Sequence, residues 1–163
     1  MIEIIAQPLT KAGFTPFGDV LELRDTPDKM INQDMCGRHH DLADFDFTDG
    51  RAGISLFDAI PRELPYHFNL VERHPLGSQA FIPMSMSPFL VIVAEDLDGT
   101  PSTPRAFITR AGQGINFHRN TWHGVLTPLH APGLFAVIDR IGDGANLQEF
   151  TYETGFMVTN QQE

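Results

Sequence analysis

Short strand-like runs of β-branched and aromatic residues recur every ten to fifteen residues along this chain. The segments between them are rich in Gly, Pro, Asp and Ser, as in residues 96–104, and no stretch has the pattern of a long amphipathic helix. Parallel βαβ folds need a helix between strands, whereas sandwiches and barrels join short strands by turns. The pattern predicts a mainly β protein, an antiparallel sandwich or barrel with few short helices. Strands are expected within residues 2–5, 20–23, 53–57, 68–74, 79–84, 89–95, 105–109, 114–118 and 134–141.

The length of 163 residues fits one ordinary domain. A chain of this size buries roughly 70 % of its unfolded surface, which is enough for a sizeable core. The sequence contains no internal repeat, no low-complexity tract and no linker that would divide it. We therefore expect a single domain over residues 1–163.

The charge and the lone cysteine restrict the partners and the compartment. Eleven basic and 21 acidic side chains give a formal charge of 11 − 21 = −10, which repels nucleic acid and anionic lipid. Cys36 has no second cysteine for an intrachain disulfide, and the first residues lack a basic signal region. The longest apolar run, residues 89–94, is far below the ~18–20 residues that span a bilayer. A cytoplasmic protein that binds neither nucleic acid nor membrane is expected.

Three potential ligands gather around one predicted turn. Glu72 and His74 lie two positions apart, so both side chains point to the same face of a β-strand. Residues 75–78 then form a turn that brings Gln79 back beside them. Imidazole nitrogen and carboxylate or amide oxygen are donors that Ni, Zn, Fe or Mn accept. A rim of solvated polar side chains on an edge strand is the alternative, and this stretch alone leaves both open.

The second half of such a site is expected from residues 114–123. His118 and His123 lie five positions apart, too far for one face of a straight strand, but residues 120–122 between them allow a bend. One of the two histidines can then face the same cavity as His74. A core histidine with a single satisfied hydrogen bond is the alternative for either one.

An arginine could add a contact to a carboxylate substrate. A planar guanidinium binds a carboxylate through two parallel hydrogen bonds. Arg140 shares a strand face with Leu134 and Ile138, so we expect it to point inward and Asp139 to point outward. A surface ion pair is the alternative for Arg140.

The two halves together resemble the metal-binding motifs of the cupin superfamily. The first cupin motif reads His or Glu, any residue, His, four residues, then Glu or Gln, which Glu72, His74 and Gln79 match. The second motif ends in a histidine, here His123. The resemblance implies a cupin-type antiparallel jelly-roll barrel with its ligands on the inside.

A closer resemblance covers nearly the whole chain. Residues 72–84, 114–123 and 137–140 look like stretches of the bacterial ureidoglycolate lyase family, and residues 17–20 and 40–42 look similar too. That family is a cupin homodimer that splits ureidoglycolate into glyoxylate and urea in allantoin degradation, with nickel as its usual metal. The resemblance implies a homodimeric carbon–nitrogen lyase acting on ureidoglycolate.

The resemblance also implies roles for individual residues. His118 would transfer protons and contact the substrate, and Arg140 would clamp the substrate carboxylate. Because Glu72 stands where a first His is common and Gln79 where Glu is common, the metal could bind weakly or be absent. A cupin that binds a small polar ligand without catalysis, or another metal-dependent cupin enzyme, remains the alternative. The metal ligands would be Glu72, His74, Gln79 and His123.

Overall fold

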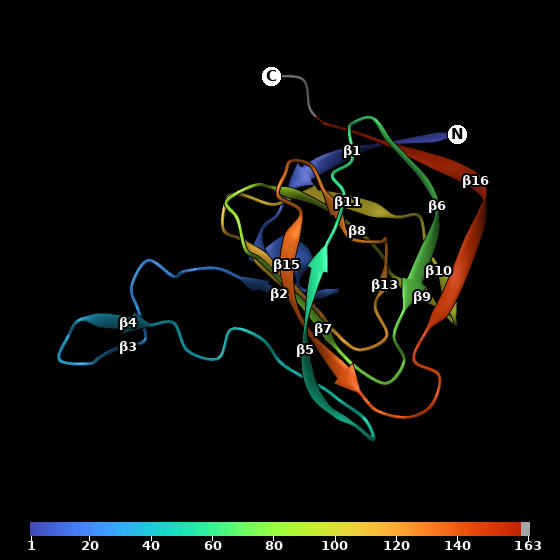
Figure 1. Ribbon diagram of the computed structural model, residues 1–163. Helices are drawn as coiled ribbons and strands as arrows, with labels where there is room; N and C mark the ends of the chain where they lie inside the picture. Colours follow the sequence, from blue (N-terminus) through green and yellow to red (C-terminus); the bar gives the residue numbers. More distant parts are fainter. Residues whose placement is uncertain (161–163) are drawn as a thin grey trace.

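The computed structural model describes residues 1–160, which form a mainly β protein with one short helix, as the strand pattern predicted. A seven-stranded sheet has the order β11-β1-β16-β6-β13-β8-β14, and β11 also pairs with β8. Six of these strands therefore close into a ring, seen around the right of Figure 1. Closure leaves the six strands no free edge. The strands are β1 (Ile2–Pro8), β6 (Tyr66–Arg73), β8 (Phe89–Ala94), β11 (Arg105–Ile108), β13 (Trp122–His123), β14 (Thr127–Pro128) and β16 (Gln148–Asn160).

A second sheet of five strands has the order β2-β12-β7-β15-β5, with every neighbouring pair antiparallel. The two sheets together correspond to the cupin-like fold that the sequence predicted. That the whole chain is a single domain stays a prediction. The strands are β2 (Gly18–Leu21), β5 (Arg51–Asp58), β7 (Gln79–Pro83), β12 (Gly114–Phe117) and β15 (Leu134–Ile141).

The remaining elements are short. The helix α1 (Lys11–Phe14) begins after Thr10, whose hydroxyl accepts a hydrogen bond from the Gly13 amide at 3.1 Å, as an N-cap does. The hairpin of β3 (Lys29–Ile31) and β4 (Cys36–Arg38) projects away from the body as an arm (Figure 1). A second small hairpin joins β9 (Asp96–Leu97) to β10 (Thr100–Pro101). No helix within residues 1–160 is long and apolar enough to cross a membrane, and the cytoplasmic location stays a prediction.

Two features of the strands go beyond the predicted pattern. Within the predicted, mainly antiparallel architecture, β1 runs parallel to both β11 and β16. No hairpin joins β1 to either neighbour, so no tight turn forces the antiparallel direction. The sequence analysis also named no strand after residue 141, whereas β16 covers thirteen residues there. Its alternation was obscured because the pairing with β6 shifts register between Thr151 and Phe156.

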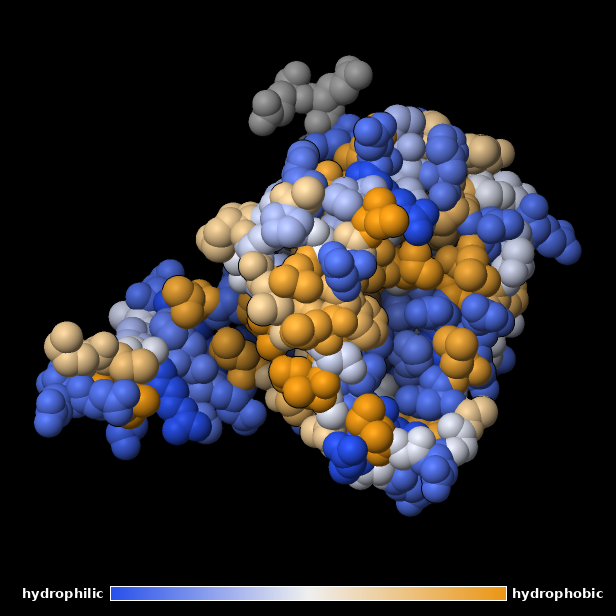
Figure 2. Space-filling view, viewed as in Figure 1, coloured by the Kyte–Doolittle hydropathy of each residue, from blue (hydrophilic) through white to orange (hydrophobic). Residues whose placement is uncertain are grey.

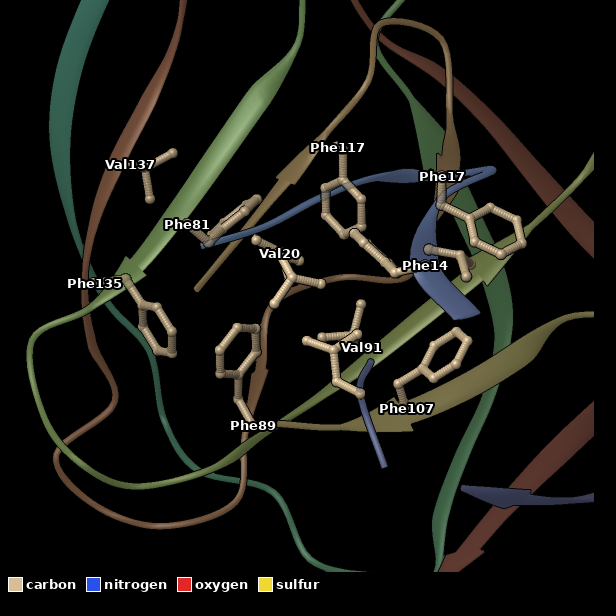
Figure 3. Close-up of a cluster of buried hydrophobic side chains, with 13 residues drawn as sticks. Phe14, Phe17, Val20, Phe81, Phe89, Val91, Phe107, Phe117, Phe135 and Val137 are labelled. Atoms are coloured by element: carbon tan, nitrogen blue, oxygen red, sulfur yellow. The ribbon is translucent and has the colours of Figure 1, made fainter. Parts of the chain in front are cut away.

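The main hydrophobic core lies between the two sheets (Figure 3). Phe89, Val91 and Val93 of β8 point into it, whereas Leu90 and Ile92 point into a second cluster with residues of β1, β11 and β16. Because β8 is buried on both faces, it reads as a continuous apolar run. The five-stranded sheet contributes the other side of the main core through Val20, Phe81, Ile115, Phe117, Phe135 and Val137.

Candidate metal centre

Glu72, His74 and His123 come together at one end of the space between the sheets. Glu72 lies near the end of β6, His74 follows that strand directly, and His123 ends β13. The antiparallel pairing of β13 with β6 sets His123 opposite Glu72, and side chains directly opposite in such a pair lie on the same face. One ligand atom from each of the three residues lies within 4.8 Å of the others. The fold thus brings together two stretches that are far apart in sequence.

Both imidazoles are held by their Nδ1 atoms. His74 Nδ1 lies 2.7 Å from the carbonyl oxygen of Asn146, and His123 Nδ1 lies 2.9 Å from that of Gly124. A carbonyl oxygen only accepts hydrogen bonds, so each Nδ1 carries a proton, and in the neutral imidazole each Nε2 is left with a lone pair. Both Nε2 atoms are buried and have no hydrogen-bond partner within the described residues. Two free nitrogen lone pairs therefore meet at this point.

His123 is fixed more firmly than His74. Its ring stacks on Phe117 with centroids 4.3 Å apart and planes 6° apart, and only 2 % of the residue is exposed. Burial lowers the pKa of His123 to about 3, although its hydrogen bond to Gly124 acts in the opposite direction. The side chain is consequently a neutral imidazole, which is the form that binds metals.

Glu72 supplies a carboxylate at the open side of the group. Its Oε1 lies 4.0 Å from His74 Nε2, and the two side chains are 24 % and 19 % exposed. Burial raises the pKa of the Glu72 carboxyl, the negative charge of Glu149 adds to this shift, and a positive charge on His74 would oppose it. Figure 2 shows a recess with hydrophilic walls between the β15–β7 side and β6. Of the three residues, Glu72 is the most exposed.

Gln79, the fourth expected ligand, lies on the inner face of β7. It shares this face with the core residue Phe81, and it is the register partner of Phe117 on β12. Its Nε2 donates a hydrogen bond to Asp139 Oδ2 at 3.2 Å, while its Oε1 is buried without a partner in the part of the chain described. A hydrogen bond therefore holds the Gln79 amide through its nitrogen, and its oxygen has no partner among the described residues.

This donor set fits a divalent metal ion. Leaving a buried acceptor without a partner costs roughly 1–3 kcal/mol, so such atoms call for an explanation. Among the described residues, the unpaired atoms at this point are the Nε2 nitrogens of His74 and His123, with the carboxylate of Glu72 beside the two imidazoles. Two imidazoles with oxygen donors are a set that borderline divalent ions accept.

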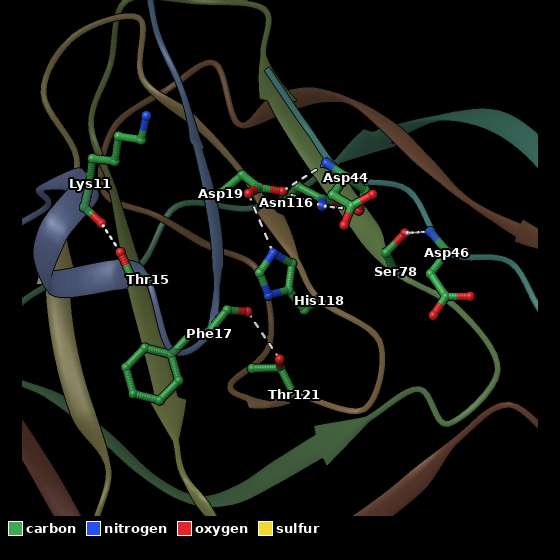
Figure 4. A network of polar contacts seen from close by, with 10 residues as sticks. All are labelled: Lys11, Thr15, Phe17, Asp19, Asp44, Asp46, Ser78, Asn116, His118 and Thr121. Carbon is green, nitrogen blue, oxygen red and sulfur yellow. Dashed lines mark hydrogen bonds and ion pairs between the residues drawn. The ribbon is translucent and has the colours of Figure 1, made fainter. Parts of the chain in front are cut away.

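His118 does not join this group. On β12 the core residues Ile115 and Phe117 point inward, so His118, which follows the strand, points to the opposite face. Its Nε2 lies 3.3 Å from Asp19 Oδ1 (Figure 4). The sequence analysis had allowed either histidine of this stretch to face His74, and only His123 does.

Asp19 is the centre of the polar network around His118. Burial alone would raise the pKa of Asp19, but hydrogen bonds from the Asp44 amide, from Asn116 and from His118 together lower it. The Asp44 amide lies 2.9 Å and Asn116 Nδ2 lies 3.0 Å from Asp19 Oδ2 (Figure 4). These contacts attach the segment before β5 to the five-stranded sheet, which is a structural role.

The expected orientation of Arg140 is wrong. Phe135 and Val137 of β15 point into the core, so Asp139 shares their inner face and Arg140 lies on the outer one. The Arg140 guanidinium donates to the carbonyl oxygens of Thr48, Asp49 and Asp143, and the residue is only 8 % exposed. The alternation of side chains along β15 was predicted, but the inner and outer faces of the strand were assigned the wrong way round, because both faces carry apolar residues.

Two residues at the site were not singled out from the sequence. Asp139, which was expected to point outward, faces inward beside Gln79, and the carbonyl oxygen of Asn146 accepts a hydrogen bond from His74 Nδ1. The larger side chains Phe135 and Val137 could have revealed which face of β15 is the core face, and hence the position of Asp139. Asn146 lies in a loop, and its sequence carries no signal of the contact with His74.

Comparisons with known proteins agree with the resemblance seen in the sequence. A family model described as ureidoglycolate lyase matches residues 1–159. A ureidoglycolate lyase from Rhodobacter capsulatus is 58 % identical over 159 residues, covering 97 % of this chain and 99 % of that protein. One from Chelativorans sp. is 51 % identical over 154 residues, or 93 % of each chain. One from Mesorhizobium japonicum is 49 % identical over 160 residues, covering 97 % and 98 %.

Proposed function

Because the chain belongs to the ureidoglycolate lyase family and has ureidoglycolate lyase activity, we propose that Glu72, His74 and His123 form its reaction centre. The substrate is ureidoglycolate, and the products are glyoxylate and urea. The observation that carries this assignment is a pair of buried Nε2 atoms that have no hydrogen-bond partner within residues 1–160 and lie beside a carboxylate. The family excludes the alternatives of a non-catalytic cupin and of a different cupin enzyme.

The proposed ligands of the metal are Glu72, His74, Gln79 and His123, and the proposed metal is nickel. A bound divalent cation acts as a Lewis acid that stabilises negative charge on a substrate oxygen and favours loss of a hydroxyl proton. The unpaired Oε1 atom supports including Gln79 in the set. An amide oxygen is a weaker ligand than a carboxylate, so moderate metal affinity is part of the proposal.

Proton transfer is assigned to Asp139 instead of His118, because Asp139 is on the inner face of its strand. The reaction removes the proton of the substrate hydroxyl, turns that carbon into the aldehyde of glyoxylate, and breaks the bond from this carbon to nitrogen. The electron pair of the broken bond stays on the urea nitrogen, which needs one proton. Asp139 takes the hydroxyl proton and returns it to that nitrogen, so atoms and charge balance. The hydrogen bond from Gln79 holds the Asp139 carboxylate beside the proposed ligands.

A direct assay tests this function. Purified protein is freed of metal, incubated with racemic ureidoglycolate with and without added nickel, and glyoxylate is followed over time. Nickel-dependent release of glyoxylate, faster than the uncatalysed reaction, is the expected result. A release rate equal to that of the uncatalysed reaction, with and without nickel, would overturn the proposal.

We also propose that two copies form a homodimer through the outer face of the five-stranded sheet. On this face Ile54 and Leu56 of β5 are 71 % and 66 % exposed, and Ile82 of β7 and Phe45 are 40 % and 42 % exposed. Figure 2 shows hydrophobic side chains gathered over β5 and β15. Monomers rarely expose a contiguous apolar patch above a few hundred Å².

The occupant of this face is a second copy of the same chain. A charge of −10 makes two copies repel one another, so they are expected to meet where charges are scarce. Stable interfaces bury about 800 Å² per partner. The adjoining β3–β4 arm, whose Met30 and Met35 are exposed, can extend the face toward that size.

A further inference from the structure

Asn146 makes two hydrogen bonds at the edge of the metal centre, one through its backbone and one through its side chain. Its carbonyl oxygen lies 2.7 Å from His74 Nδ1, and its Oδ1 accepts a hydrogen bond from the Leu76 amide, also at 2.7 Å. Asn146 belongs to the loop between β15 and β16, whereas His74 and Leu76 belong to the turn between β6 and β7. One loop residue therefore contacts the imidazole and the turn that carries it.

The backbone contact determines which nitrogen of His74 is protonated. Neutral imidazole exists as two tautomers of similar energy in water, and a hydrogen bond at one nitrogen selects between them. The Asn146 carbonyl accepts the proton of Nδ1, so Nε2 is left with the lone pair that lies beside Glu72 and His123. Without this contact, the tautomer that carries its proton on Nε2 would form as well. That tautomer has no lone pair on Nε2 with which to bind a metal ion.

The side-chain contact determines where that carbonyl lies. Arg140 lies near the end of β15, and its Nη2 donates a hydrogen bond to the carbonyl oxygen of Asp143, in the loop between β15 and β16, at 2.9 Å. Three residues later, the bond from the Leu76 amide to Asn146 Oδ1 attaches the loop to the β6–β7 turn. Asn146 itself is partly buried, while its neighbour Leu147 is 51 % exposed. The loop is thus fixed at two points on either side of its exposed turn.

We propose that Asn146 is a positioning residue of the metal centre, whose side chain holds the loop so that its carbonyl keeps His74 as the Nδ1-protonated tautomer. The inference rests on the proposed function only in taking His74 as a metal ligand; the tautomer itself belongs to the metal-free protein. Outer contacts of this kind commonly change metal affinity by roughly 10–100-fold when they are removed.

Three variants separate positioning from a general effect on the fold. Asn146→Ala removes the acceptor for the Leu76 amide, Asn146→Asp keeps an acceptor of the same shape, and Leu147→Ala changes an exposed neighbour as a matched control. Nitrogen-15 NMR of the metal-free proteins reports the tautomer of His74, assigned by the signal missing from His74→Gln. Competition with a chelator gives the affinity for nickel, and thermal unfolding gives stability.

The wild type, Asn146→Asp and Leu147→Ala are expected to show a single Nδ1-protonated tautomer of His74 and similar nickel affinity. Asn146→Ala is expected to show mixed tautomers and roughly 10–100-fold weaker nickel binding. A wild type with the Nε2-protonated tautomer, or an Asn146→Ala variant with unchanged tautomer and affinity, would overturn the inference. Because the wild-type tautomer is a test by itself, an unfolded alanine variant does not remove it. Failure of the wild type to bind nickel would contradict the proposed metal and leave the tautomer result standing.

Discussion

The imidazole rings of His74 and His123 lie with their centroids 5.2 Å apart and their planes inclined by 40°. Each ring donates from Nδ1 to a backbone carbonyl, and each keeps a buried Nε2 atom without a partner among the described residues. Buried acceptor atoms of this kind are normally satisfied by a hydrogen-bond donor or a bound ion. A cation between them would satisfy both.

Removing either histidine is expected to abolish nickel binding and to lower turnover by orders of magnitude. The two variants should differ in stability, because His123 is buried and stacked on Phe117 whereas the His74 side chain is 19 % exposed. His123→Ala should lower the free energy of unfolding by about 2–4 kcal/mol, and His74→Ala by less. Urea unfolding and equilibrium dialysis measure the two effects. Normal turnover in either variant would refute its assigned role.

Asp139→Asn separates proton transfer from metal binding. An asparagine can still accept the hydrogen bond from Gln79 Nε2, so the amide should keep its orientation and nickel affinity should change little. Loss of the proton acceptor should lower kcat by about 10²–10⁴-fold. Steady-state kinetics at saturating nickel measures kcat. If kcat were unchanged, another group would have to take the proton.

Arg140→Lys should affect stability and leave substrate affinity alone. A lysine cannot reach the carbonyls of Thr48, Asp49 and Asp143 together, so the variant should lose about 1–3 kcal/mol of unfolding free energy. The ratio of KM values for variant and wild type, measured below the melting temperature, should be close to unity. A large rise in KM with unchanged stability would instead support the prediction from the sequence that Arg140 binds the substrate carboxylate.

The contribution of Asp19 to stability should depend on pH. Its pKa is lowered in the folded protein from the usual 3.8, so the carboxylate stabilises the fold fully above that value. As pH falls through the lower folded pKa, this contribution is lost. The difference in unfolding free energy between the wild type and Asp19→Asn should therefore be largest near neutral pH and shrink below about pH 4. A difference that grows toward low pH would contradict the assigned direction.

A charge placed on the outer sheet face should separate the proposed dimer. Leu56→Glu puts a carboxylate where each copy would otherwise bury an apolar side chain. Because Leu56 is 66 % exposed in the single chain, the fold should tolerate the substitution. Light scattering after size exclusion should give a dimer for the wild type and a monomer for the variant. Ile5→Glu, at a 50 % exposed position on β1, serves as the control and should stay dimeric. A dimeric Leu56→Glu would exclude this face.

The fold class was predicted correctly from local patterns, and the family from the resemblance of several stretches to ureidoglycolate lyases. Short strands between Gly- and Pro-rich turns indicated the β fold, and the spacing of Glu72, His74 and Gln79 indicated a cupin motif. Side-chain direction was harder, because β15 has apolar residues on both faces and the parity argument gave the faces of Asp139 and Arg140 in the wrong order. The contact of Asn146 with His74 could not be predicted, because it is made by a backbone carbonyl, which every residue type has. The roles of the site residues, the identity of the metal and the dimer stay predictions.

Titration of the metal-free protein with nickel, with bound metal and glyoxylate release measured on the same samples, tests the central claim most directly. Turnover should rise in proportion to bound nickel and level off when each chain holds one ion, and His74→Ala should show neither binding nor turnover under the same conditions. Full turnover without bound metal, or nickel binding that survives in both His74→Ala and His123→Ala, would contradict a metal centre at these residues.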